Sequence, residues 1–289
     1  MFVSNPASVL RFKNHPLPRR SEIGATQRVP ILGVPVSTVT IERAISTVGD
    51  WIGEGESRYI STCDVHCIMR ARSEPNLLAA FNAADMVVPD GKPVEWTARA
   101  RTDQPMTRVC GPDLMLELSK RSAETGWRHY YYGGAPGVAE DLAERMSKRY
   151  SGLQVAGTWC PPFRPMSEAE QDEEVARIID SGAQIVWVGL GCPKQDLWMH
   201  THAHKIPGAV SIGVGAAFDF HTGRIARAPV WMQKNGLEWA HRLSSEPSRL
   251  WRRYLVMAPQ FLVLSGLETL EGKARARKTF RQTGSLDGR

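Results

Sequence analysis

The 289-residue sequence lacks several patterns that define common classes of protein. Its five cysteines are scattered and form no CxxC pair, which argues against a disulfide framework and a zinc knuckle. No apolar run approaches the about 18 residues that a membrane-spanning helix needs. The first 28 residues contain no long hydrophobic region and no evident cleavage site, unlike a secretory signal. These absences favour a protein of a reducing cytoplasm.

Three cofactor and metal signatures are also missing. No Gly-x-Gly-x-x-Gly is followed by an acidic residue for a ribose, as in dinucleotide-binding folds. No Asp-x-Asp is present to hold a divalent cation on a sugar diphosphate. His200, His202 and His204 alternate with other residues, but no HExxH arrangement exists, and solvated helix histidines explain them better. We therefore expect no metal site and no cofactor.

The chain carries an excess of positive charge. The net charge is +6 and the isoelectric point is about 9.2, which favours an anionic partner. Nucleic acid, a phosphorylated substrate or an acidic membrane face would each fit this charge. The basic residues gather near the C-terminus without a nucleic-acid-binding motif, so we expect no nucleic acid partner.

Strand-like and helix-like segments alternate from about Val29 onward. This alternation predicts an α/β fold, a Rossmann-like and mostly parallel sheet with helices on both faces, followed by a C-terminal helical appendage. The strands are expected within 29–37 (a strand or hairpin), 58–64, 86–90, 128–134, 153–159, 183–191 and 209–217. The predicted divisions are an N-terminal arm over 1–28, disordered or loosely docked, a catalytic domain over 29–228, a membrane-proximal appendage over 229–270 and a basic tail over 271–289.

Three glycine-rich junctions follow predicted strands. They contain Gly133-Gly134, Gly189 with Gly191, and Gly215. Glycines at such turns let the backbone approach a ligand, and the next helix N-terminus can hold a phosphate. A tight turn without a ligand explains any one of them equally well. Three on the same side of a parallel sheet instead indicate a nucleotide-sized pocket, with Lys194 and Gln195 at the second junction.

The stretch "ADMVVPDG" ends an apolar run on Asp90, between a proline and a glycine. Pro-Asp-Gly is good turn chemistry and needs no further purpose. A carboxylate at the end of a buried strand could also lie at the mouth of a ligand pocket. Asp85 is a weaker candidate, because its odd separation from Asp90 along a strand directs it to the opposite face.

The C-terminal segment combines arginines with aromatic residues. Arg242, Arg249 and Arg252 lie among Trp239, Trp251 and Tyr254. Arginines suit diphosphate recognition, and the aromatic residues suit a membrane–water interface. An ordinary amphipathic helix pair packed on the core remains an alternative.

Several blocks of the sequence together resemble the WecG/TagA/CpsF glycosyltransferases, family 26 in the carbohydrate-enzyme classification. The resemblance runs from about Pro30 to Arg253. It rests on blocks that occur in the family's order and spacing: "ADMVVPDG", "RVCGPDLMLEL", "GLGCPKQD", "GVGAAFDFHTG", "RAPVWMQKNGLEW" and "EPSRLWRR".

The resemblance implies a role for individual residues. Asp90 corresponds to the catalytic base, with Thr62 beside it and Arg108 as an active-site arginine. The donor-binding set expected on these grounds and from the glycine junctions is Asp64, Gly133, Gly134, Gly189, Gly191, Lys194, Gln195, Gly215 and Asp219. Arg242, Arg249 and Arg252 match appendage arginines that close over the diphosphate. Two positions depart from the family pattern: Asp64 replaces an asparagine, and Asp196 replaces the commoner glutamate.

The resemblance also implies the reaction. Members resemble inverting, metal-independent enzymes that move a sugar from a UDP-sugar to a polyprenyl-diphosphate-linked saccharide at the cytoplasmic face of the cell membrane. N-acetylmannosamine, its uronic acid, glucose or a related hexose would be the donor sugar. The resemblance is compatible with a homo-oligomer. Two rival functions stay open, a dinucleotide-dependent oxidoreductase and a non-catalytic membrane-surface binding protein.

Overall fold

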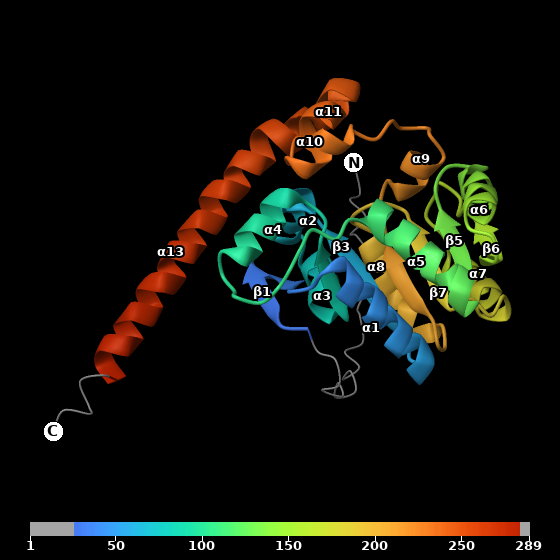
Figure 1. The fold of residues 1–289 in the computed structure, drawn as a ribbon, viewed down its shortest axis with the longest axis horizontal. Helices are drawn as coiled ribbons and strands as arrows, with labels where there is room; N and C mark the ends of the chain where they lie inside the picture. The colour runs from blue at the N-terminus through green and yellow to red at the C-terminus, as the bar shows by residue number, and fades with distance from the viewer. Residues whose placement is uncertain (1–25, 284–289) are drawn as a thin grey trace, which may run out of the picture.

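A six-stranded parallel sheet forms the centre of the molecule in the computed structural model, which describes residues 26–283 (Figure 1). Its strand order is β4-β3-β8-β7-β5-β6. The strands are β3 (Arg58–Cys63), β4 (Met86–Pro89), β5 (Arg128–Gly133), β6 (Gln154–Trp159), β7 (Ile185–Gly189) and β8 (Val210–Gly213). The predicted fold class is confirmed.

A two-stranded antiparallel hairpin precedes this sheet. It joins β1 (Arg28–Ile31) to β2 (Val34–Ser37) through Leu32 and Gly33, which both have positive φ angles, as the right-handed twist of a two-residue hairpin requires. The Ser37 hydroxyl oxygen accepts a hydrogen bond from the Val87 amide at 3.1 Å, which ties the hairpin to β4. The hairpin alternative predicted for residues 29–37 is the one observed.

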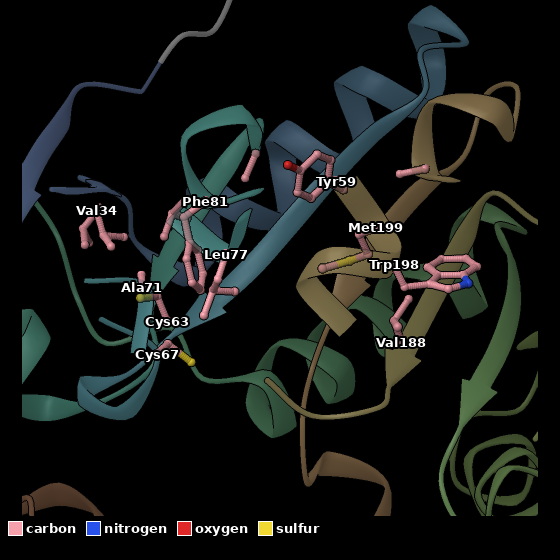
Figure 2. Close-up of a cluster of buried hydrophobic side chains, with 14 of the residues drawn as sticks. Val34, Tyr59, Cys63, Cys67, Ala71, Leu77, Phe81, Val188, Trp198 and Met199 are labelled. Carbon is pink, nitrogen blue, oxygen red and sulfur yellow. The ribbon is translucent and has the colours of Figure 1, made fainter. Parts of the chain in front are cut away.

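Helices cover both faces of the sheet. Alternate residues along β5 enter different cores: Tyr130 and Tyr132 belong to one, and Tyr131 to the other. The first core packs against α2 (Val65–Ala71), α3 (Pro75–Ala83), α7 (Glu168–Asp180) and α8 (Lys194–His202), and Figure 2 shows part of it. The second packs against α1 (Ile41–Glu54), α5 (Gly111–Thr125), α6 (Val138–Arg149) and α9 (Ala217–His221). Buried on two faces, the strands read as continuous apolar runs.

Local sequence chemistry sets the ends of several helices. Ser167 and Glu170 form a capping box at the start of α7. Helix α6 begins at Val138, with Gly137 as its N-cap in a left-handed conformation. Pro136 therefore lies before the N-cap and outside the helix.

The C-terminal region is helical and leaves the sheet domain. It consists of α10 (Val230–Lys234), α11 (Glu238–Ser245), α12 (Pro247–Trp251), a π-helical segment (Arg252–Met257) and α13 (Ala258–Thr283). Figure 1 shows α13 running past α4 (Lys92–Arg99) and β1, with its far end projecting from the domain. Glu268 fastens α13 to the sheet domain, because its Oε2 lies 2.7 Å from Arg101 Nη1 and 3.0 Å from the Leu32 amide nitrogen.

Two of the predicted domain divisions do not coincide with what the structure describes. The arm predicted over 1–28 lies outside the described residues apart from its last three. Helix α13 continues through the predicted boundary between appendage and tail at residue 270. Within residues 26–283, no helix combines the length and apolar character that crossing a bilayer requires.

Candidate active site

The carboxyl ends of the strands bring the predicted residues to one edge of the sheet. Cys63 pairs with Pro89 in the parallel register, so Asp64 and Asp90 leave neighbouring strands at the same level. The Asp90 amide donates a 2.9 Å hydrogen bond to the Cys63 carbonyl oxygen. Gly133 pairs with Gly189 in the same way. The expectation that these junctions share one side of the sheet is confirmed.

Asp90 is a half-buried carboxyl between β4 and α4. Removal from water raises the pKa of Asp90 to about 7, and the negative charges of Asp64 and Glu238 act in the same direction. The positive charge of Arg108 opposes this rise. Gly91 follows as the N-cap of α4. The Pro-Asp-Gly stretch is therefore a turn and also places a carboxylate at the sheet edge, so the two interpretations do not exclude each other.

Asp85 lies at the other end of β4. Its Oδ2 accepts a hydrogen bond from the Tyr59 amide at 3.0 Å, and its Oδ1 lies 3.1 Å from Arg58 Nη1. Both contacts join the amino ends of β3 and β4. Asp85 is therefore a structural residue, remote along the strand from Asp90.

Arg108 connects Asp90 to the appendage. Its Nε donates to the backbone carbonyl oxygen of Asp90 at 2.5 Å, and its Nη2 lies 2.7 Å from Glu238 Oε2 on α11. A single guanidinium thus holds the turn that carries Asp90 and the first long helix of the C-terminal region.

Asp64 forms a second connection to the appendage. It caps α2, accepting a hydrogen bond from the Cys67 amide at 3.0 Å, and its other oxygen pairs with Arg253. Burial raises the pKa of Asp64, and the charge of Arg253 partly offsets that rise. Two ion pairs, Arg108–Glu238 and Arg253–Asp64, therefore join the sheet domain to the appended helices.

Arg253, which the predicted arginine set does not include, pairs with Asp64 at the sheet edge. The three predicted arginines make other contacts. The Arg242 guanidinium lies 5.5 Å from the centroid of the Phe220 ring, and Arg249 forms an ion pair with Glu246 at 2.6 Å. Arg252 lies over the neighbouring Trp251 ring at 5.3 Å and is exposed. The block "EPSRLWRR" ends on Arg252 and Arg253, so the sequence signal that points to the first arginine also covers the second.

Thr62 and Gln195 are buried and bond to backbone groups of the edge loops. The Thr62 hydroxyl donates to the Gly213 carbonyl oxygen at 2.8 Å. Gln195 Oε1 accepts from the amides of Gly191, at 3.1 Å, and Gly215, at 2.9 Å. Gln195 therefore fixes the spacing of the loops that follow β7 and β8.

The predicted glycines divide into two groups. A side chain at Gly133 would meet the Gly189 backbone at 2.7 Å, and one at Gly189 would meet the Phe218 ring at 3.0 Å. A side chain at Gly134 would crowd Val138 in the same way. In contrast, nothing lies within 4 Å of the missing side chains of Gly191 and Gly215. Close packing explains the first three, whereas the last two border open space where a ligand can approach.

The remaining predicted residues flank these loops. Lys194 is exposed in the first turn of α8, and Asp219 is half-buried on α9. Asp196 is fully buried, and neither of its carboxylate oxygens finds a hydrogen-bond partner among the described residues. Burial therefore raises the pKa of Asp196 well above its usual range, which favours the neutral acid.

The fold and this edge define a class. A Rossmann-like domain that gathers a carboxylate of raised pKa, open glycine loops and arginines from an appended helical region has the architecture of a nucleotide-dependent transferase. Comparison with known families identifies which one. The model of the Glycosyl transferase WecG/TagA/CpsF family matches residues 29–275, so the chain belongs to this family and is a glycosyltransferase.

Two relatives carry the same name, N-acetylglucosaminyldiphosphoundecaprenol N-acetyl-beta-D-mannosaminyltransferase. The protein from Bacillus spizizenii is 29% identical over 205 residues, which cover 71% of this chain and 77% of the relative. The protein from Bacillus subtilis is 28% identical over 221 residues, which cover 76% of this chain and 82% of the relative. The family resemblance expected from the sequence blocks is confirmed.

Proposed function

We propose that this glycosyltransferase moves a hexose from a UDP-sugar to a polyprenyl-diphosphate-linked saccharide, with inversion at the anomeric carbon and without a metal ion on the diphosphate. The names of the two relatives favour N-acetylmannosamine as the sugar and an undecaprenyl-diphosphate-linked N-acetylglucosamine as the acceptor. The uronic acid of that sugar, glucose or a related hexose are the other candidates. The observation that carries the proposal is the position of Asp90, half-buried at the carboxyl end of β4 with its backbone carbonyl oxygen bonded to Arg108.

Asp90 supplies the base that an inverting transfer needs. An acceptor hydroxyl oxygen attacks the anomeric carbon while its proton passes to an Asp90 oxygen. The bond between the anomeric carbon and the diphosphate oxygen breaks in the same step, and UDP leaves with the electron pair. A carboxyl group whose pKa is about 7 is partly ionised at neutral pH and accepts a proton readily.

Arginines supply the positive charge that the departing diphosphate requires. Arg108 and Arg253 stand at the edge, and each is paired with a carboxylate, Glu238 and Asp64 respectively. Arg242, Arg249 and Arg252 lie on the appended helices and would reach the diphosphate if the appendage closes over it. Guanidinium groups bind phosphate oxygens in a bidentate manner, which is the role we assign to this set in place of a divalent cation.

A screen of UDP-sugars tests this proposal. UDP-N-acetylmannosamine with a polyprenyl-diphosphate-linked N-acetylglucosamine, in buffer without added Mg²⁺, is expected to give a disaccharide of inverted anomeric configuration, measured by NMR of the product. A retained configuration would contradict the single-displacement mechanism. Heat protection by NAD but not by UDP would contradict a UDP-sugar as the donor.

The acid limb of the pH–rate profile should move in opposite directions in two variants. Removing the charge of Arg108 in Arg108→Gln removes a contribution that lowers the pKa of Asp90, so the limb is expected at higher pH. Removing the charge of Glu238 in Glu238→Gln removes a contribution that raises it, so the limb is expected at lower pH. The measurement is kcat/KM against pH, and shifts in the same direction would contradict this arrangement.

Membrane attachment of the appendage is the remaining part of the proposal. The appended helices expose several large apolar side chains: Trp231, Leu237, Trp239, Trp251, Leu255, Val256, Leu262, Val263, Leu267 and Leu270. Aromatic and aliphatic residues beside exposed arginines suit the interface of an anionic membrane, here the cytoplasmic face. The lipid-linked acceptor would then be within reach of the sheet edge.

The double substitution Leu255→Glu with Val256→Glu should weaken binding to anionic vesicles by about tenfold or more, because it places two charges on the apolar surface. Vesicle co-sedimentation of the full chain measures this. Ile179→Glu is the matched control, since Ile179 is an exposed aliphatic residue of the sheet domain. Equal binding by the double variant and the control would contradict attachment through the appendage.

A further inference from the structure

Two cysteines and a histidine from distant parts of the chain meet beside the sheet edge. His66 and Cys67 lie in the first turn of α2, and Cys192 lies in the loop between β7 and α8. One ligand atom from each of the three residues lies within 4.8 Å of the other two. All three belong to the described residues, and the cysteines are free thiols.

The expectation of no metal rested on spacing along the sequence, where Cys67 and Cys192 are far apart. The sheet brings them together, because β3 and β7 are separated in it only by β8. Figure 2 shows Cys63 and Cys67 at one end of the buried cluster, close to Ala71 of α2. The proximity of Cys67 and Cys192 therefore results from the strand order of the sheet and not from a local sequence motif.

We propose that Cys67, Cys192 and His66 bind one thiophilic divalent cation, for which Zn²⁺ is the best fit. Two thiolate sulfurs and one imidazole nitrogen are ligands that select zinc over the hard cations Mg²⁺ and Ca²⁺. Two sulfurs bound to one zinc ion lie about 3.8 Å apart in a tetrahedral site, so small movements of the side chains complete the geometry. Binding releases one proton from each thiol to solvent.

The burial of the three residues suits an ion that enters from solvent. Cys67 is 5% exposed, whereas His66 and Cys192 are half-buried and so are partly accessible to solvent. The carboxylate of Asp64 is already engaged, by the Cys67 amide and by Arg253. Asp64 is therefore not counted among the ligands.

A metal ion at this position would connect two segments of the sheet edge. Helix α2 carries Asp64 as its N-cap, and the loop with Cys192 contains Gly191, whose amide donates a hydrogen bond to Gln195 Oε1. An ion bound between them joins two of the loops that border the candidate donor pocket. None of the three ligands is a residue to which we assign the proton transfer or the diphosphate, so the ion would hold the edge and take no part in the displacement.

Cobalt binding tests the site directly and does not depend on transferase activity. The full chain, stripped with a chelator and kept reduced, is titrated with Co²⁺, whose thiolate complexes have a charge-transfer band. We expect one equivalent per chain and displacement of the band by Zn²⁺. Less than about one tenth of an equivalent, or binding without a thiolate band, would overturn the proposal.

Matched variants locate the ligands. Cys192→Ser and His66→Ala are expected to weaken binding by at least tenfold, and Cys67→Ser to do the same where it folds. Cys160→Ser is the control, because Cys160 lies outside the cluster with its thiol 3.3 Å from the Gly134 carbonyl oxygen. Undiminished binding in the double variant of Cys192 and His66, or an equal loss in Cys160→Ser, would overturn the assignment even if Cys67→Ser fails to fold.

Discussion

Asp90→Asn is expected to lower the rate of sugar transfer by about 10²–10⁴ without unfolding the protein. The substitution keeps the size of the side chain and removes the oxygen that accepts the proton of the acceptor hydroxyl. Turnover with saturating donor and acceptor measures the effect. Asp85→Asn is the matched control, since it changes the other aspartate of the same strand at the end remote from the site.

Stability separates a catalytic role of Asp90 from a structural one. The pKa of Asp90 rises from 3.8 to about 7, so the folded protein binds this proton more tightly than the unfolded chain does. Ionisation therefore costs the folded state stability, and the free energy of unfolding falls as pH rises between these two values. Asp90→Asn removes that cost, so its thermal midpoint at pH 8 should equal or exceed that of the wild type. An unstable variant or a fully active one would instead indicate that Asp90 has only a structural role in the turn.

Truncation after Gly236 is expected to lower transfer by at least about a hundredfold, because it removes every appendage arginine together with Glu238. Both cores of the sheet domain remain, apart from Phe261 of α13, which is buried in the first core. The truncated chain should therefore fold, with a lower thermal midpoint.

A second truncation controls for the loss of chain length. Ending the chain at Gly272 keeps all of the appendage arginines and the Arg101–Glu268 ion pair. This shorter deletion should keep most of the activity. Full activity after truncation at Gly236 would show that the appendage is dispensable. Equal losses in the two truncated proteins would place the essential residues in the last 17 positions.

The sequence predicted the sheet domain because its signals are local and repeated. Buried parallel strands alternate with helices, the capping box marks the start of α7, and glycines mark the strand ends. Helix α4 was missed, because its eight residues begin with a lysine and a proline directly after the Asp90 turn. A segment that short gives too few turns for a periodic pattern.

The candidate site could be predicted only in part, because long-range geometry decides the rest. Asp90 and Asp64 follow from strand ends, which the sequence marks. Arg249 and Arg252 share a face on a regular helix, but the π-helical segment that begins at Arg252 widens the turn. Arg253 then contacts Asp64. The meeting of Cys67 with Cys192 depends likewise on strand order, which spacing along the chain does not reveal.

The pH dependence of kcat/KM for transfer by the wild-type protein, with Asp90→Asn measured in parallel, tests the central claim most directly. We expect the wild-type value to rise about tenfold per pH unit below about 7 and to level off above it, because only ionised Asp90 accepts the proton. The residual activity of Asp90→Asn should lack that limb. A flat wild-type profile from about pH 5.5 to 8, or the same limb in both proteins, would contradict the assignment of Asp90 as the base.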